Sequence, residues 1–145
     1  MMFKKLNRDG AENVFRTVLN VEGATITTGR AVSLKTAAAS IDGISGVIAN
    51  ASGDYPGFAG IAIEDIPNND YGLIQTSGFV ASVLISNEGS SITINAGDPL
   101  VPAAGGVASA APSYANSGFR FLTADNTVPA AISAAAYVGG LFKML

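Results

Sequence analysis

The stretch LIQTSGFVASVLIS (residues 73–86) decides the fold, because it is the longest apolar run with strand periodicity in the chain. Turn sequences bound it on both sides, PNNDYG (67–72) before it and NEGSS (87–91) after it. Gly78 stands in its middle, where we expect a bulge or the close approach of a second backbone. The stretch therefore predicts a long strand that is interrupted at Gly78.

Shorter apolar runs, cut by glycine, flank this strand on both sides. Turn signals recur about every 8–14 residues, a spacing typical of an antiparallel sandwich or barrel rather than of βαβ units. No linker divides the chain, so we predict one β domain over 13–145, preceded by an arm over 1–12. The remaining predicted strands are NVFRTVLNV (13–21), ATIT (24–27), RAVSLK (30–35), GVIAN (46–50), GFAGIAIEDI (57–66), ITINAGDPLVP (92–102), GFRFLTA (118–124) and SAAAYVGGLFKML (133–145).

Two of these strands have a helical alternative. Asp9 and Glu12 have the spacing of a capping box and would start a helix over 13–21, but the β-branched residues there and the turn at Glu22 and Gly23 favour a strand. Ala135 and its neighbours in 133–145 suit a strand or a short helix. Residues 103–118, rich in Ala, Gly and Ser, read as a long loop.

The composition indicates a folded protein with a partner-covered surface. Hydrophobic residues make up 48% of the chain and charged residues 13%, about half the usual share. This argues against disorder, since disordered chains are charged and poor in apolar residues. A surface with so few charges favours cover by another molecule.

The charges are unevenly placed. Residues 1–30 hold five basic and three acidic side chains, and the remainder holds three basic and eight acidic ones. The basic excess is either a solvated tail or an arm that docks on an acidic neighbour. No basic patch with interleaved aromatics is present, so we expect no nucleic-acid partner. The run 128–142 is too short to span a bilayer. The first residues, MMFKK (1–5), are not followed by the long apolar stretch of a signal peptide, so we expect no membrane partner.

The sequence carries no constellation typical of catalysis. The chain has no His and no Cys, which removes the commonest general base, metal ligand and thiol chemistry. Glu64 and Asp65 are adjacent on a predicted strand, so their side chains point to opposite faces and form no dyad. SGDYPG (52–57) and NNDYG (68–72) suit turns better than a calcium site. We expect no enzyme, no catalytic residue, no metal and no cofactor. A glycosidase with two distant carboxylates is the alternative, although the chain lacks Trp.

Several stretches together resemble the capsid decoration (cement) proteins of tailed bacteriophages. The resemblance covers about two-thirds of the chain, and its motifs are turn residues and strand faces rather than catalytic groups. It rests on VLNVEGATITTGRAVSL (18–34), GFAGIAIEDIPNNDYGLIQTSGFVASVLIS (57–86), ITINAGDPLVP (92–102) and YVGGLFKML (137–145).

The resemblance implies a small antiparallel β-barrel or β-tulip domain with an extended N-terminal arm. It implies a virion protein that is assembled in the host cytoplasm and binds the outside of the head. There it would clamp neighbouring subunits of the major capsid protein, as a homotrimer or a dimer. A carbohydrate- or receptor-binding β module on the virion surface is the alternative. The residues we predict at the capsid or oligomer interface are Phe3, Lys4, Lys5, Leu6 and Arg8 in the arm, and Pro99, Leu100, Val101 and Pro102 after a tight turn over 96–98.

Overall fold

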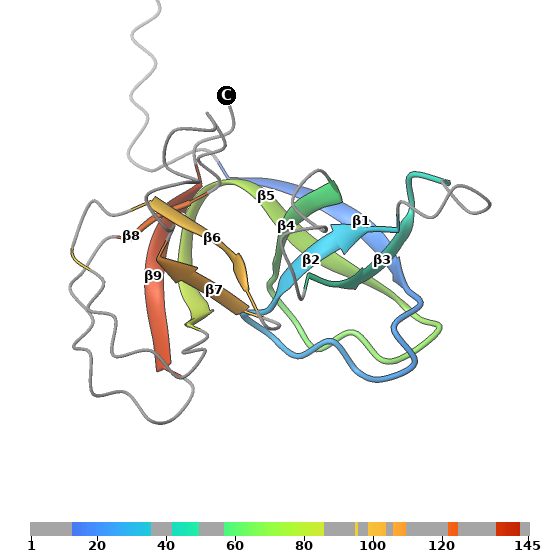
Figure 1. Ribbon diagram of the computed structural model, residues 1–145. Helices are drawn as coiled ribbons and strands as arrows, with labels where there is room; N and C mark the ends of the chain where they lie inside the picture. Colours follow the sequence, from blue (N-terminus) through green and yellow to red (C-terminus); the bar gives the residue numbers. More distant parts are fainter. Residues whose placement is uncertain are drawn as a thin grey trace, which may run out of the picture.

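Every regular element in the described part of the chain is a strand. The computed structural model describes residues 13–35, 42–49, 57–85, 95, 99–103, 106–109, 122–124 and 136–142. Figure 1 shows the strands, which are β1 (Val14–Asn20), β2 (Ala31–Leu34), β3 (Ser45–Ile48), β4 (Phe58–Ala62), β5 (Tyr71–Ile85), β6 (Pro99–Ala103), β7 (Gly106–Ser109), β8 (Leu122–Ala124) and β9 (Ala136–Phe142).

The two helical alternatives are excluded, because 14–20 and 136–142 are both strands. Two predictions were wrong in part. The segment 24–27 contributes only an isolated bridge between Ile26 and Ile66. The loop predicted over 103–118 contains β7, which pairs with β6 as Ala103↔Gly106 across a two-residue gap in the sequence. Its small residues form a strand because β6 supplies a paired edge, which outweighs their weak intrinsic preference.

The first five strands close into a barrel in the order β1-β3-β2-β4-β5, with β5 pairing back to β1. Four of the pairings are antiparallel, and the β1–β3 pairing is parallel. A closed ring with an odd number of strands cannot alternate in direction all the way round. One parallel pair is therefore a requirement of closure in an otherwise antiparallel barrel.

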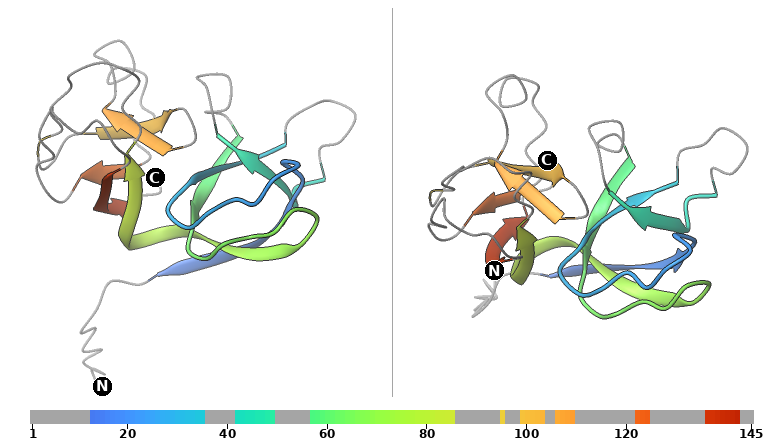
Figure 2. Two further views of the ribbon diagram at one scale, coloured as in Figure 1. Left: turned by 90° about the horizontal axis from the view of Figure 1, so that it is seen from below. Right: turned by 60° about the horizontal axis from the view of Figure 1, so that its bottom comes forward.

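A second barrel follows the same plan. Its order is β5-β7-β6-β8-β9, with β9 pairing back to β5 and the β5–β7 pairing parallel. β5 is thus the last strand of the first barrel and the first strand of the second, and it runs through both lobes in Figure 2. The small all-β barrel fold expected from the sequence is confirmed, in the form of two barrels that share one strand.

β5 bends where it passes from one barrel to the other. Gly78 lies there with φ of +96°, a conformation that glycine adopts without steric cost. The Gln75 side chain spans the bend, since its Nε2 lies 3.0 Å from the carbonyl oxygens of Ser77 and Phe79. The interruption predicted at Gly78 is therefore the junction of the two barrels.

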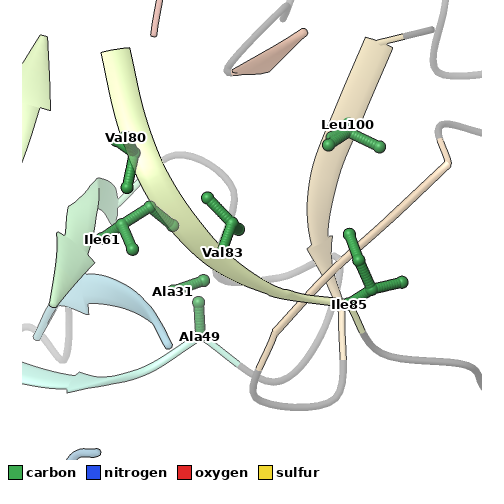
Figure 3. Packing of buried hydrophobic residues seen from close by; sticks show 7 residues of the cluster. All are labelled: Ala31, Ala49, Ile61, Val80, Val83, Ile85 and Leu100. Carbon is green, nitrogen blue, oxygen red and sulfur yellow. The ribbon is translucent and has the colours of Figure 1, made fainter. Parts of the chain in front are cut away.

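Two clusters of buried apolar residues stabilise the barrels. One fills the first barrel and consists of Val18, Ile26, Val32, Ile48, Ala62, Ile66 and Ile74. The other joins the barrels, as Figure 3 shows, and consists of Ala31, Ala49, Ile61, Val80, Val83, Ile85 and Leu100. A backbone hydrogen bond from Leu84 N–H to the Gly29 carbonyl, 2.9 Å long, crosses the same junction.

The turns of the first barrel are built by the residue types that the sequence predicts for them. Asn69 has φ of +62°, and the N–H of Asp70 donates to the Pro67 carbonyl over 3.1 Å. The fully buried Asn20 donates to the carbonyls of Ala24 and Ile66 over 2.8 and 2.7 Å. These bonds satisfy a buried amide and fix the loops that close one end of the barrel.

Candidate functional site

Strand alternation places large apolar side chains on the outside of the first barrel. Val18 points inward and is fully buried, so Phe15 and Leu19, at odd offsets from it, point outward. The antiparallel pair Leu19↔Tyr71 brings Tyr71 to the same face, and Leu73 follows at the next outward position of β5. We call Phe15, Leu19, Tyr71 and Leu73 the outer face.

Three residues of the outer face are strongly exposed. Phe15 is 48% exposed, Tyr71 61% and Leu73 38%. Ile63 borders them, because its N–H donates to the Leu73 carbonyl over 3.3 Å, and it is also exposed. Contiguous exposed apolar residues are typical of a surface that another molecule covers.

The outer face continues onto the junction with the second barrel. Phe79, just after the bend of β5, is 40% exposed. Its N–H donates to Asn13 Oδ1 over 3.2 Å, and the same oxygen accepts from Gln75 Nε2 over 3.1 Å. Asn13 precedes β1 directly, so this network ties Phe79 to the strand that carries Phe15.

Carboxylates of the first barrel serve as acceptors for backbone N–H groups. Asp65 Oδ1 accepts from the N–H and the hydroxyl of Thr28, and these bonds lower the pKa of Asp65. Glu64 Oε1 accepts from Leu73 N–H over 2.8 Å. Glu64 and Asp65 therefore bond to different segments, as expected from their adjacent positions.

Asp42 caps the segment that leads into β3. Its Oδ1 accepts from the N–H groups of Ile44 and Ser45 over 2.8 and 2.7 Å, and its Oδ2 accepts from the Ser45 hydroxyl. These hydrogen bonds, that of the Ser45 hydroxyl foremost, lower the pKa of Asp42 to about 2. The Arg16 guanidinium donates to the neighbouring Gly43 carbonyl. The charged groups here organise the entry to β3.

The structure locates only some of the interface residues predicted from the sequence. Leu100, Val101 and Pro102 lie on β6 and are buried within the chain itself, so they offer no exposed side chain to a partner. Pro99 begins β6. The predicted turn over 96–98 and the arm residues Phe3, Lys4, Lys5, Leu6 and Arg8 lie outside the described residues.

Sequence reasoning missed the outer face. The alternation in 13–21 separates Phe15, Thr17 and Leu19 from Val18, but it does not say which set faces solvent. In the part of the chain described by the structure, no group of three or more acidic residues is arranged to hold a metal ion. Within the same residues, no helix is long and apolar enough to cross a membrane.

The comparison with known proteins rests on the fold. No protein-family model matches the chain, and no curated protein matches it by sequence. Among solved structures, the chain is similar to the N base of head fiber gp8.5 in bacteriophage phi29, with a TM-score of 0.55 and 13% identity. The match covers 91% of this chain and 95% of that chain. The likeness therefore extends over the two-barrel architecture and shows a shared fold.

Proposed function

We propose that this chain is a structural protein of a bacteriophage virion that binds the outside of the head. There it stabilises contacts between neighbouring subunits of the major capsid protein, without catalytic turnover. The observation that carries the proposal is the fold likeness to a head fiber base over nearly the whole of both chains. A shared fold alone does not fix a function, so the surface must also suit the role.

The outer face suits a lasting contact between proteins. Phe15, Tyr71 and Leu73 are exposed and uncharged, and they lie on the paired strands β1 and β5. Aromatic side chains have few rotatable bonds for their contact area, so burying them costs little conformational entropy and they are frequent at strong contacts. We assign the outer face to the head surface.

The proposal includes self-association and a role for the arm. We expect a homotrimer, with a dimer as the alternative, because many copies that each contact two or three subunits gain avidity from weak contacts. The basic residues of 1–12 give the arm an electrostatic attraction to an acidic partner surface.

Co-sedimentation with empty phage heads tests the proposal. The full chain is sized by light scattering, mixed with empty heads and pelleted. We expect stoichiometric pelleting that saturates, with weaker pelleting when 1–12 is deleted. A chain that stays in the supernatant with heads in excess would contradict the proposal.

A second function has one observation in its favour. Tyr71, the most exposed large apolar residue among those described, is suited to stacking on a sugar ring. A carbohydrate- or receptor-binding module on the virion would use it in that way. Binding to a glycan array that is lost in Tyr71→Ser, together with no pelleting on heads, would favour this function.

A further inference from the structure

The two barrels are internal repeats, related strand by strand. Replacing β1, β2, β3, β4 and β5 by β5, β6, β7, β8 and β9 turns the order of the first barrel into that of the second. The parallel pair is also in the corresponding place, β1–β3 in the first barrel and β5–β7 in the second. The chain therefore holds one architecture twice, with the shared strand serving both.

The pairing registers agree residue by residue, which fixes the equivalent positions. In the β1–β5 pairing and the β5–β9 pairing, the same residue types stand opposite each other at one rung, Leu19↔Tyr71 and Leu84↔Tyr137. From Phe79 onward, the register of the β5–β9 pairing shifts once, between Val80 and Val83. The other equivalent rungs are Phe15↔Gln75 with Phe79↔Leu141, Arg16↔Ile74 with Val80↔Gly140, and Val18↔Gly72 with Val83↔Val138.

Some identities between the repeats follow from packing, and others do not. Val18 and Val83 are equivalent, identical and fully buried, so the core explains them. Phe15 and Phe79 are equivalent and identical, yet they are 48% and 40% exposed. Tyr71 is 61% exposed, and the backbone places Tyr137 at its register position. Neither core packing nor turn geometry calls for the same exposed phenylalanine in both repeats.

We propose that each repeat carries an equivalent docking surface, and that one chain binds two neighbouring, identical subunits of a partner lattice. The first surface centres on Phe15 and Tyr71, and the second on Phe79 at the equivalent position. This inference rests on the proposed function, and it adds the geometry of the contact. Two like surfaces on one rigid chain match a partner that presents one surface repeatedly, as a head lattice does.

The two phenylalanines belong to adjoining surfaces of one chain. Asn13 accepts from Phe79 N–H and lies two residues before Phe15, so the two surfaces adjoin where one barrel passes into the other. The apolar cluster at this junction holds the repeats in one relative position. Because the shared residue is an uncharged aromatic, we expect an apolar contact here, whose strength depends less on salt than that of the basic arm.

Bivalent attachment makes a definite prediction for affinity. When two sites on one rigid body bind neighbouring subunits, the second contact forms within the complex, and avidity exceeds either single affinity by about 10²–10⁴-fold. Removing either phenylalanine leaves a monovalent chain. We therefore expect Phe15→Ser and Phe79→Ser each to weaken binding about 100-fold or more, with no detectable pelleting for the double variant.

The binding stoichiometry distinguishes bivalent attachment from a general effect of the substitutions on the surface. Full chain, Phe15→Ser, Phe79→Ser, the double variant and Ile44→Ser are titrated onto empty phage heads and pelleted. Ile44 is a control of similar exposure, 46%, whose carbonyl accepts from Leu19 N–H and is kept in the serine variant. We expect the full chain and Ile44→Ser to saturate at one chain per two head subunits. Each single phenylalanine variant should saturate at about one chain per subunit, at the higher concentrations that its weaker binding needs.

The outcomes distinguish the two proposals. Tight pelleting of the full chain with unchanged affinity and saturation for Phe79→Ser would overturn the bivalent contact and leave the proposed function standing. A full chain that does not pellet at all would overturn the proposed function and this inference with it. Loss of binding in Ile44→Ser to the same degree would attribute the effect to stability, and a binding constant that falls steeply with salt would assign the contact to the basic arm.

Discussion

The joint between the two barrels can be tested with a pair of isoleucines. Ile61 on β4 is fully buried in the cluster that joins the barrels, whereas Ile63, two residues later, is 36% exposed. The two side chains are chemically identical, and neither lies in the interior of the first barrel. Replacing each by alanine therefore compares the same deletion with and without the second barrel packed against it.

The expected magnitude follows from the neighbours of Ile61. Truncating a buried isoleucine to alanine costs about 2–5 kcal/mol, depending on how well the site collapses. Ala31 and Ala49, which share the cluster, have no rotamers with which to fill the space. We therefore expect Ile61→Ala to lie in the upper part of the range, at about 3–5 kcal/mol, and Ile63→Ala at about 1 kcal/mol or less.

Urea unfolding at neutral pH, followed by circular dichroism, measures both free energies. For a chain of this length, a loss of about 3 kcal/mol also lowers the Tm by about 6–12 °C, which a thermal scan detects. Equal losses for Ile61→Ala and Ile63→Ala would refute the packing of the two barrels against each other. If the first unfolding transition of Ile61→Ala removes only part of the circular-dichroism signal, the two barrels unfold separately.

Three further predictions follow from named contacts. The chain should unfold in one transition, because the barrels share β5 and one cluster, and two resolved transitions by calorimetry would contradict this and the single domain predicted over 13–145. Gly60→Ala should destabilise the fold by about 3 kcal/mol, since a Cβ there would lie 2.3 Å from the Gln75 carbonyl oxygen, and an unchanged urea midpoint would show that the strands can separate at no cost. The folded pKa of Asp42 lies below its unfolded value, so its capping bonds stabilise the fold above about pH 4 and are lost as the pH falls towards 2; Asp42→Asn should flatten the loss of stability between pH 5 and 2, and an equally steep loss in the variant would refute that role.

Much of the fold can be read from the sequence because its strands are marked by strong local signals. The long apolar run around Gly78 predicts β5 and its interruption, and the turn residues near Asn69 predict the loop that the structure shows. The helical alternatives for 13–21 and 133–145 fail because each segment completes a ring of strands by pairing with β5. The local preferences of the residues do not decide between helix and strand in these segments, whereas the pairing that closes each barrel does.

The missed features depend on contacts that are distant in sequence. β7 consists of small residues and becomes a strand only beside β6 and β5. To predict the outer face, one must know which side of β1 is covered. The alternation of side chains along a strand separates the two sides but does not show which one is covered. Leu100, Val101 and Pro102 are predicted from the sequence as interface residues after a turn, but they lie on β6, between β7 and β8, and are buried within the chain.

The internal repeat did leave a signal in the sequence. VLNVEGATIT (18–27) and VLISNEGSSIT (83–93) share Val-Leu, Glu-Gly and Ile-Thr in the same order, with one residue inserted in the second copy. YGLI (71–74) and YVGGLF (137–142) match in a similar way at the last strand of each barrel. Such short matches become meaningful once the registers place Leu19 with Leu84 and Tyr71 with Tyr137.

Cryo-electron microscopy of empty phage heads mixed with the full chain tests the central claim most directly. The account predicts a two-lobed density on the outside of the head, with the strands that carry Phe15 and Phe79 turned towards the shell and one lobe over each of two neighbouring subunits. Heads without added density would contradict the proposed function. Density whose outer face points to solvent would contradict the assignment of that face to the head surface.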